Sequence, residues 1–86
     1  MGETIGSRVK RLRTKSDLST ESLGLLAGMS RSYVGNLERD EIFNPSGKAL
    51  LQIANILGTN VEFLVSGIGS EPEEAKVRAS VAKAGG

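Results

Sequence analysis

The amino-acid sequence predicts an all-α fold, a compact bundle of five short helices with a possible extra helix at the C-terminus. Apolar residues recur three or four positions apart in five successive segments, as they do along one face of a helix. Brief connections rich in capping residues separate these segments. Five helices with such short connections leave no room for a sheet.

The first predicted helix covers residues 4–16, where Ile5, Val9 and Leu12 share one face. Basic residues occupy the remaining positions, and we expect Arg8, Lys10, Arg11 and Lys15 to lie mainly outside. Residues 8–15 contain no acidic side chain, and a solvated helix face is the simplest explanation of such a run.

Residues 20–39 read as two short helices joined at Gly28. Their apolar positions are Leu23, Ala27, Met29, Val34 and Leu37. Gly28 suits the left-handed conformation that ends a helix and redirects the chain, and Ser30 suits the N-cap of the next helix. Gly24 falls on the inner face, where the missing side chain lets the helices approach closely. This arrangement is a helix-turn-helix, with its second helix from about Arg31 to Arg39.

Two further helices complete the expected bundle. Ser46 can cap a helix over residues 47–57, and Asn60 can cap a short one over residues 61–65. The preceding loop contains Ile42 and Phe43, which either fold back onto the core or contact a second subunit.

Residues 70–86 differ in composition from residues 1–69, because they are rich in alanine and charged groups. Val77 and Val81 are four apart and would share a helix face. An isolated helix of this length is marginal in water. The segment is therefore either a frayed tail or a helix that docks on a partner subunit, and residues 1–69 form the expected domain.

The composition excludes several kinds of chemistry. The 86 residues include neither cysteine nor histidine, so disulfides, thiolate metal sites and imidazole-dependent catalysis are ruled out. No paired carboxylates mark an evident pocket. We therefore expect a protein that is not an enzyme and needs neither cofactor nor metal. Without a signal peptide or a membrane-spanning stretch, a cytoplasmic location is the expectation.

Four short motifs accompany the helix-turn-helix in a characteristic order. They are Arg8-Val-Lys-Arg-Leu-Arg13, Leu37-Glu38-Arg39, Asn44-Pro-Ser46 and Ile53-Ala-Asn-Ile-Leu-Gly58. With them, residues 5–66 resemble the phage-repressor and Cro-type helix-turn-helix family, whose lambda-repressor-like domains are five-helix bundles. Thr20 departs from the pattern, since the family often has a glutamine there that braces the recognition helix. Asp17 and Asp40 stand where glycine is common.

The resemblance implies a sequence-specific regulator of transcription, expected to be a repressor, encoded by a prokaryote or phage. The second helix of its helix-turn-helix, at about 31–39, would read the major groove of double-stranded DNA. The candidate base-reading residues are Ser30, Arg31, Ser32, Gly35 and Asn36. Arg31 suits guanine and Asn36 suits adenine, while Gly35 would let the helix axis sit close to the DNA.

Other residues are candidates for contacts with the DNA backbone. They are Ser19, Thr20, Ser22, Tyr33, Arg39, Asn44, Ser46 and Lys48. The resemblance also implies a partly buried ion pair between Arg13 and Glu38, which would tie the first helix to the third.

The expected assembly is a homodimer on a palindromic operator. Candidate dimer contacts are Ile42, Phe43, Val65, Ile68, Val77 and Val81. The rival interpretation is an antitoxin or anti-repressor-like module that binds a partner protein, with residues 70–86 free for that role. The polar and basic side chains of the helix at 31–39 favour DNA.

Overall fold

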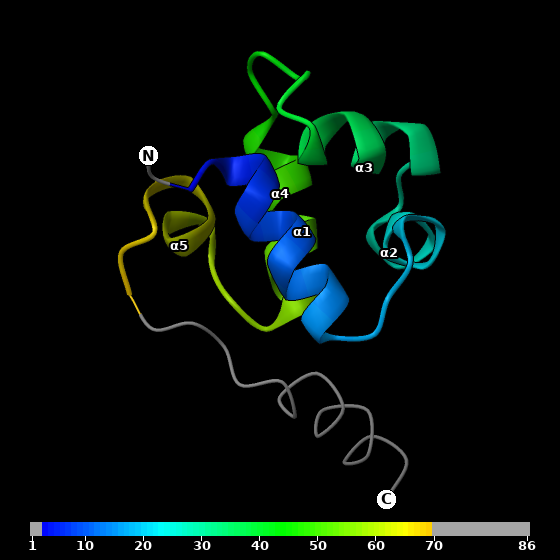
Figure 1. Ribbon diagram of the computed structural model, residues 1–86, viewed down its shortest axis with the longest axis horizontal. Coiled ribbons are helices and arrows are strands. Elements are labelled where there is room, and N and C mark those ends of the chain that lie inside the picture. Colours follow the sequence, from blue (N-terminus) through cyan, green and yellow to red (C-terminus); the bar gives the residue numbers. More distant parts are fainter. Residues whose placement is uncertain (1–2, 70–86) are drawn as a thin grey trace, which may run out of the picture.

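Five α-helices build the part of the chain that the computed structural model describes, residues 3–69 (Figure 1). In chain order they are α1 (Ile5–Lys15), α2 (Thr20–Ala27), α3 (Arg31–Glu38), α4 (Gly47–Leu57) and α5 (Val61–Ser66). No strand occurs within these residues, so the all-α, five-helix prediction is confirmed. The expected C-terminal helix, with Val77 and Val81, lies outside the described range.

Each helix starts at a side chain that can accept a hydrogen bond from the first turn. The five N-caps are Thr4, Ser19, Ser30, Ser46 and Asn60, and each accepts from the backbone N–H three residues on. Gly28, Gly58 and Gly67 end α2, α4 and α5 in the left-handed conformation. These local signals fix the helix boundaries to within a residue or two of those expected from the sequence.

The helices enclose one apolar core. In Figure 1, α1 runs through the middle of the view, with α2 and α5 on opposite sides and α4 behind it. Side chains from all five helices fill the space between them. The buried apolar residues are Val9, Leu12, Leu23, Ala27, Val34, Leu37, Leu50, Ile53, Ala54, Leu57, Phe63 and Leu64.

Two glycines allow backbones to touch. A Cβ on Gly24 would lie 2.6 Å from the backbone oxygen of Met29, as the close approach of α2 and the turn requires. A Cβ on Gly6 would overlap the backbone oxygen of Leu37 and lie 2.7 Å from that of Glu38. The first turn of α1 therefore packs directly on the last turn of α3, a contact that the sequence analysis did not predict.

Asp40 fastens the same junction. Its φ is +61°, in the left-handed region that glycine adopts most easily, which fits its place at a position where glycine is common in the family. Its carboxylate accepts hydrogen bonds from the Thr4 hydroxyl at 2.7 Å and the Gly6 backbone N–H at 3.1 Å. Asp40, which follows the C-cap of α3, therefore also fastens the start of α1.

The expectation that Arg8 faces solvent is wrong. This side chain is only 8% exposed, and its Nη1 donates to the backbone oxygens of Leu64 at 2.8 Å and Val65 at 3.2 Å. The carbonyls in the last turn of a helix lack intrahelical partners, so a guanidinium aimed at them is favourable. Nη2 also donates to the backbone oxygen of Glu3. Arg8 is thus the link between α1 and α5.

The contact at Gly6 predicts that Gly6→Ala destabilises the fold. Alanine favours a helix by roughly 1 kcal/mol over glycine, but the clash with α3 should outweigh this and lower the free energy of unfolding by about 1–3 kcal/mol. Urea denaturation measures the change. Gly47→Ala is the matched control, because a Cβ there meets no atom within 4 Å and should cost nothing. Equal stability of the two variants would show that α1 and α3 are not in close contact.

Candidate nucleic-acid interface

The outer face of α3 borders a shallow hollow of about 310 Å³. On the opposite face, Val34 and Leu37 anchor the helix in the core. Successive turns therefore leave Arg31, Ser32 and Asn36 on the side away from the bundle. The hollow is lined by Thr20, Arg31, Ser32, Gly35, Asn36 and Arg39.

This surface brings together four of the five candidate base-reading residues. The fifth, Ser30, is the N-cap of α3, and its hydroxyl accepts from the backbone N–H of Tyr33 at 3.0 Å. Thr20 joins the hollow from the start of α2, and Arg39 joins it from the end of α3. Arg39, a candidate for contact with the DNA backbone, thus lines the same hollow as the base-reading candidates.

Side-chain contacts link the residues at the C-terminal end of the hollow. Arg39 Nη2 donates to Asn36 Oδ1 at 2.7 Å, and Arg39 Nε donates to Glu41 Oε1 at 3.3 Å. Arg39 also covers Gly35, where a Cβ would lie 3.3 Å from Nη1. The guanidinium therefore lies against the helix beside Gly35.

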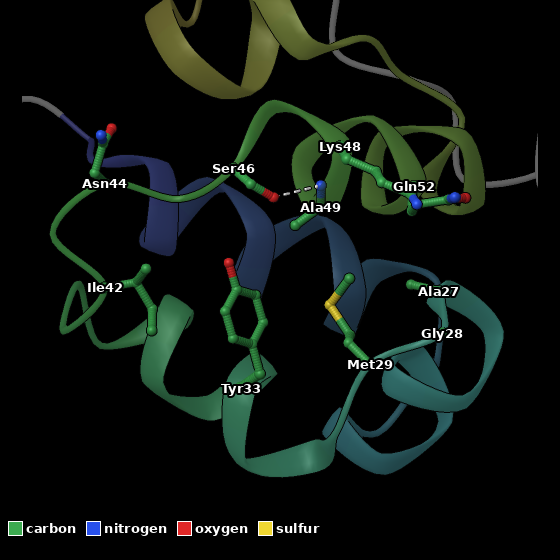
Figure 2. Close-up of a pocket in the computed structure, with 10 residues that line it drawn as sticks. All are labelled: Ala27, Gly28, Met29, Tyr33, Ile42, Asn44, Ser46, Lys48, Ala49 and Gln52. Carbon is green, nitrogen blue, oxygen red and sulfur yellow. Dashed lines mark hydrogen bonds between the residues drawn. The ribbon is translucent and has the colours of Figure 1, made fainter.

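A second, larger cleft of about 650 Å³ lies between α3 and the N-terminus of α4 (Figure 2). Tyr33 and Met29 rise into it from the α3 side, facing Ser46, Lys48 and Gln52. Its remaining lining residues are Ala27, Gly28, Ile42, Asn44 and Ala49. Candidate phosphate-binding residues Tyr33, Asn44, Ser46 and Lys48 thus share one cleft.

The remaining phosphate candidates stand at the N-terminus of α2. Ser19 is the N-cap, accepting from the backbone N–H of Ser22 at 2.9 Å, and the two hydroxyls are 3.0 Å apart. Both residues belong to the same helix start as Thr20. The helix N-termini of α2 and α4 therefore meet α3 at two different surfaces, the hollow and the cleft.

Arg13 and Glu38 form the expected ion pair between α1 and α3. Arg13 Nε lies 2.6 Å from Glu38 Oε2, and Nη2 donates to Oε1 at 3.1 Å. Nη1 donates to the backbone oxygen of Leu18 at 2.7 Å. Only 12% of the Arg13 side chain and 6% of the Glu38 side chain are exposed. The pair therefore holds the end of α3 from inside the bundle, leaving its outer face open.

The candidate dimer residues within the described range divide into two groups. Ile42 is partly buried and packs against the core, which is the first of the two alternatives given for it, folding back onto the core. Phe43 is fully exposed, and Val65 and Ile68 at the end of α5 are about half exposed or more. Val77 and Val81 lie outside the described residues.

Neither a metal site nor a membrane span is found among residues 3–69. No group of three or more acidic side chains in this range is arranged to hold a metal ion. None of the five helices is long and apolar enough to cross a membrane.

The fold and the exposed outer face of α3 define a helix-turn-helix protein of the lambda-repressor and Cro type. The helix-turn-helix family model matches residues 9–64, and the chain belongs to this family. The family consists of DNA-binding regulators, not of enzymes.

Curated relatives include regulators of phage and bacterial origin. The chain is 39% identical over 62 residues to an immunity repressor protein of Bacillus phage phi105, covering 72% of this chain and 42% of the repressor. It is 33% identical over 61 residues to the HTH-type transcriptional regulator SinR of Bacillus subtilis, covering 71% of this chain and 55% of SinR. The chain thus spans about half the length of these relatives.

Solved structures of two such regulators are similar to this fold. The P22 c2 repressor in complex with a synthetic operator superposes with a TM-score of 0.73 at 27% identity, over 77% of this chain and 98% of the repressor chain. SinR in complex with DNA gives a TM-score of 0.68 at 33% identity, over 71% of this chain and 97% of that chain.

The Arg13–Glu38 pair predicts a large effect of Glu38→Ala on stability. Removing the carboxylate leaves the mostly buried Arg13 without its partner, which should lower the free energy of unfolding by about 3 kcal/mol. Thermal unfolding measures the loss. Glu41→Ala is the matched control, because the Arg39–Glu41 pair is exposed and should contribute about 0–1 kcal/mol. An unchanged Tm for Glu38→Ala would refute the structural role of the pair.

Proposed function

We propose that this protein is a sequence-specific transcriptional regulator, acting as a repressor, that inserts α3 into the major groove of double-stranded DNA. The observation that supports this best is the hollow on the outer face of α3, where polar and basic side chains gather without an acidic one. An α-helix fits the width of the major groove, and the N-terminal residues of a recognition helix reach the base edges first.

Arg31 and Ser32 are the base-reading residues at the N-terminal end of α3. Both are exposed and line the hollow. The guanidinium of Arg31 can donate to both O6 and N7 of guanine, a contact worth about 1–3 kcal/mol of discrimination against other bases. Ser32 can donate or accept, so it tolerates more than one base.

Phosphates would bind on the two flanks of α3. The N-terminus of α2, with Ser19, Thr20 and Ser22, offers free backbone N–H groups and the positive end of the helix dipole. The N-terminus of α4, with Ser46 and Lys48, offers the same together with a cation. Contacts of this kind fix the position of α3 in the groove and supply affinity without sequence preference.

A homodimer on a palindromic operator is the proposed assembly, with residues 1–69 as the DNA-binding domain. A single α3 reaches only a few base pairs, whereas two copies related by a two-fold axis would read half-sites about 34 Å apart. Phe43, Val65 and Ile68 are exposed apolar side chains available for such an interface. A cytoplasmic location fits this role.

Selection of duplexes from a random pool, followed by binding measurements at several salt concentrations, tests the proposed function. Phosphate contacts release counterions, so log K should fall linearly with log salt. The measurement uses duplexes selected from a random pool, and an unselected duplex serves as control. A binding constant that does not respond to salt, or a pool that yields no common sequence, would contradict the proposal and favour a protein partner.

Arg31→Ala and Lys48→Ala should have different effects on DNA binding. Without Arg31, preference should relax at one base position in each half-site, because a direct base contact is lost. Without Lys48, all sequences should bind more weakly to a similar degree, since a phosphate contact is lost. Repeating the selection with both variants distinguishes these results. An unchanged preference in Arg31→Ala would exclude this residue from base reading.

A further inference from the structure

The cleft between α3 and the N-terminus of α4 has two sides of different chemistry (Figure 2). Its apolar side consists of Met29, Ile42 and the ring of Tyr33, and the first two also pack against the core. Its polar side consists of Ser46, Lys48 and Gln52. At about 650 Å³, the cleft falls within the range of about 300–1,000 Å³ that small-molecule sites occupy.

The polar groups around the cleft are not used up by the fold. Among residues 3–69, no hydrogen bond or ion pair engages the Tyr33 hydroxyl, the Lys48 ammonium group or the Gln52 amide. The Ser46 hydroxyl accepts from the backbone N–H of Ala49 at 3.0 Å and keeps its own O–H to donate. These groups are therefore available to a ligand.

The charge of the cleft favours an anion. Lys48 supplies a cation, and none of the residues that line the cleft is acidic. The cleft also adjoins the positive end of the α4 helix dipole. An anionic group bound on the polar side would accept charge-assisted hydrogen bonds from Lys48 and a hydrogen bond from Ser46.

The apolar side indicates that the anion carries an apolar part. A phosphate group alone would use the polar side only, because it has no apolar surface to set against Met29 and Ile42. Removing such surface from water is favourable, so a ligand that joins an anionic group to a ring or an alkyl chain matches both sides of the cleft.

We infer that this cleft binds a small amphipathic anion, a carboxylate, sulfonate or phosphate ester attached to an aromatic or aliphatic group. The bound anion occupies Ser46 and Lys48, the groups proposed to hold a DNA phosphate, so ligand and DNA exclude each other. This consequence rests on the proposed DNA-binding function. The ligand then acts as an effector that releases the protein from its operator.

Fluorescence titration of the full-length chain with anilinonaphthalene sulfonate tests the site. This probe joins a sulfonate to aromatic rings and binds accessible apolar surface. It should bind to a single site on the chain. Phenylnaphthylamine, the same ring system without the sulfonate, should bind more weakly, and the difference between the two probes measures the contribution of the anionic group.

Lys48→Gln and Gln52→Glu should each weaken binding of the sulfonate probe. The first removes the cation, and the second adds an acid to a cleft that has none. The loss should be about 2- to 5-fold, because both positions are exposed. Leu25→Ser is the matched control, since Leu25 is 77% exposed and does not line the cleft. Equal affinity of all three variants for the sulfonate probe would overturn the inference.

Competition with a selected duplex tests the effect on DNA binding. The probe should lower the apparent affinity for the duplex, and the duplex should lower the affinity for the probe by the same factor. A complex that holds both at full affinity would overturn the effector role. A chain that binds the probe as expected but selects no duplex would support the site and contradict the proposed function. A chain that binds the duplex without Lys48-dependent binding of the probe would overturn this inference alone.

Discussion

The constraint on which the rest of the structure depends is that α3 is positioned by contacts on its inner face and at its ends, while its outer face stays uncovered. The outer face of α3 borders an open hollow, so the position of this helix has to come from contacts on its inner face and at its ends. The Arg13–Glu38 ion pair supplies one such contact, with both side chains largely buried. Gly6 and Gly24 supply two others, because they let backbone pack on backbone. Rigid contacts of this kind support precise placement of the outer face of α3, the surface proposed to read DNA.

The basic residues of α1 show how a charge run can be structural. Arg8 donates to the carbonyls that end α5, Arg11 pairs with Glu3 at 2.7 Å, and Arg13 pairs with Glu38. Their charges are therefore engaged within the bundle. The formal net charge of the whole sequence is only +1. In the proposed function, attraction to DNA would therefore have to come from local charged groups and helix dipoles.

Local signals made much of the fold predictable. Capping residues such as Ser19 and Ser46, glycines such as Gly28, and apolar periodicity act within a few residues, so the sequence displays them directly. Gly6 and Arg8 were missed because their partners are more than 30 residues away, in α3 and α5. From the sequence alone, a charged residue such as Arg8 is expected to face solvent, and its burial becomes evident only when the packing of α5 is known.

The sequence was enough to predict which residues of α3 share its outer face, but not the hydrogen bonds between their side chains. The outward face of α3 followed from helical spacing, and the structure brings these residues to one hollow. The bond between Asn36 and Arg39 depends on which way two side chains turn. One local signal was available, since a glycine four residues before an arginine on the same helix face leaves space for it to fold back.

The burial of Arg8 also bears on the order in which the fold can be assembled. Its hydrogen bond to Leu64 joins residues 56 positions apart, whereas α2 and α3 are neighbours along the chain. Contacts between distant residues form only after a costly loop closure, and those between neighbours form early. During synthesis, the guanidinium of Arg8 has to wait for α5 to leave the ribosome before it finds the carbonyls that it caps. The link that Arg8 makes between α1 and α5 can therefore form only after the contacts between elements nearer in the sequence have become possible.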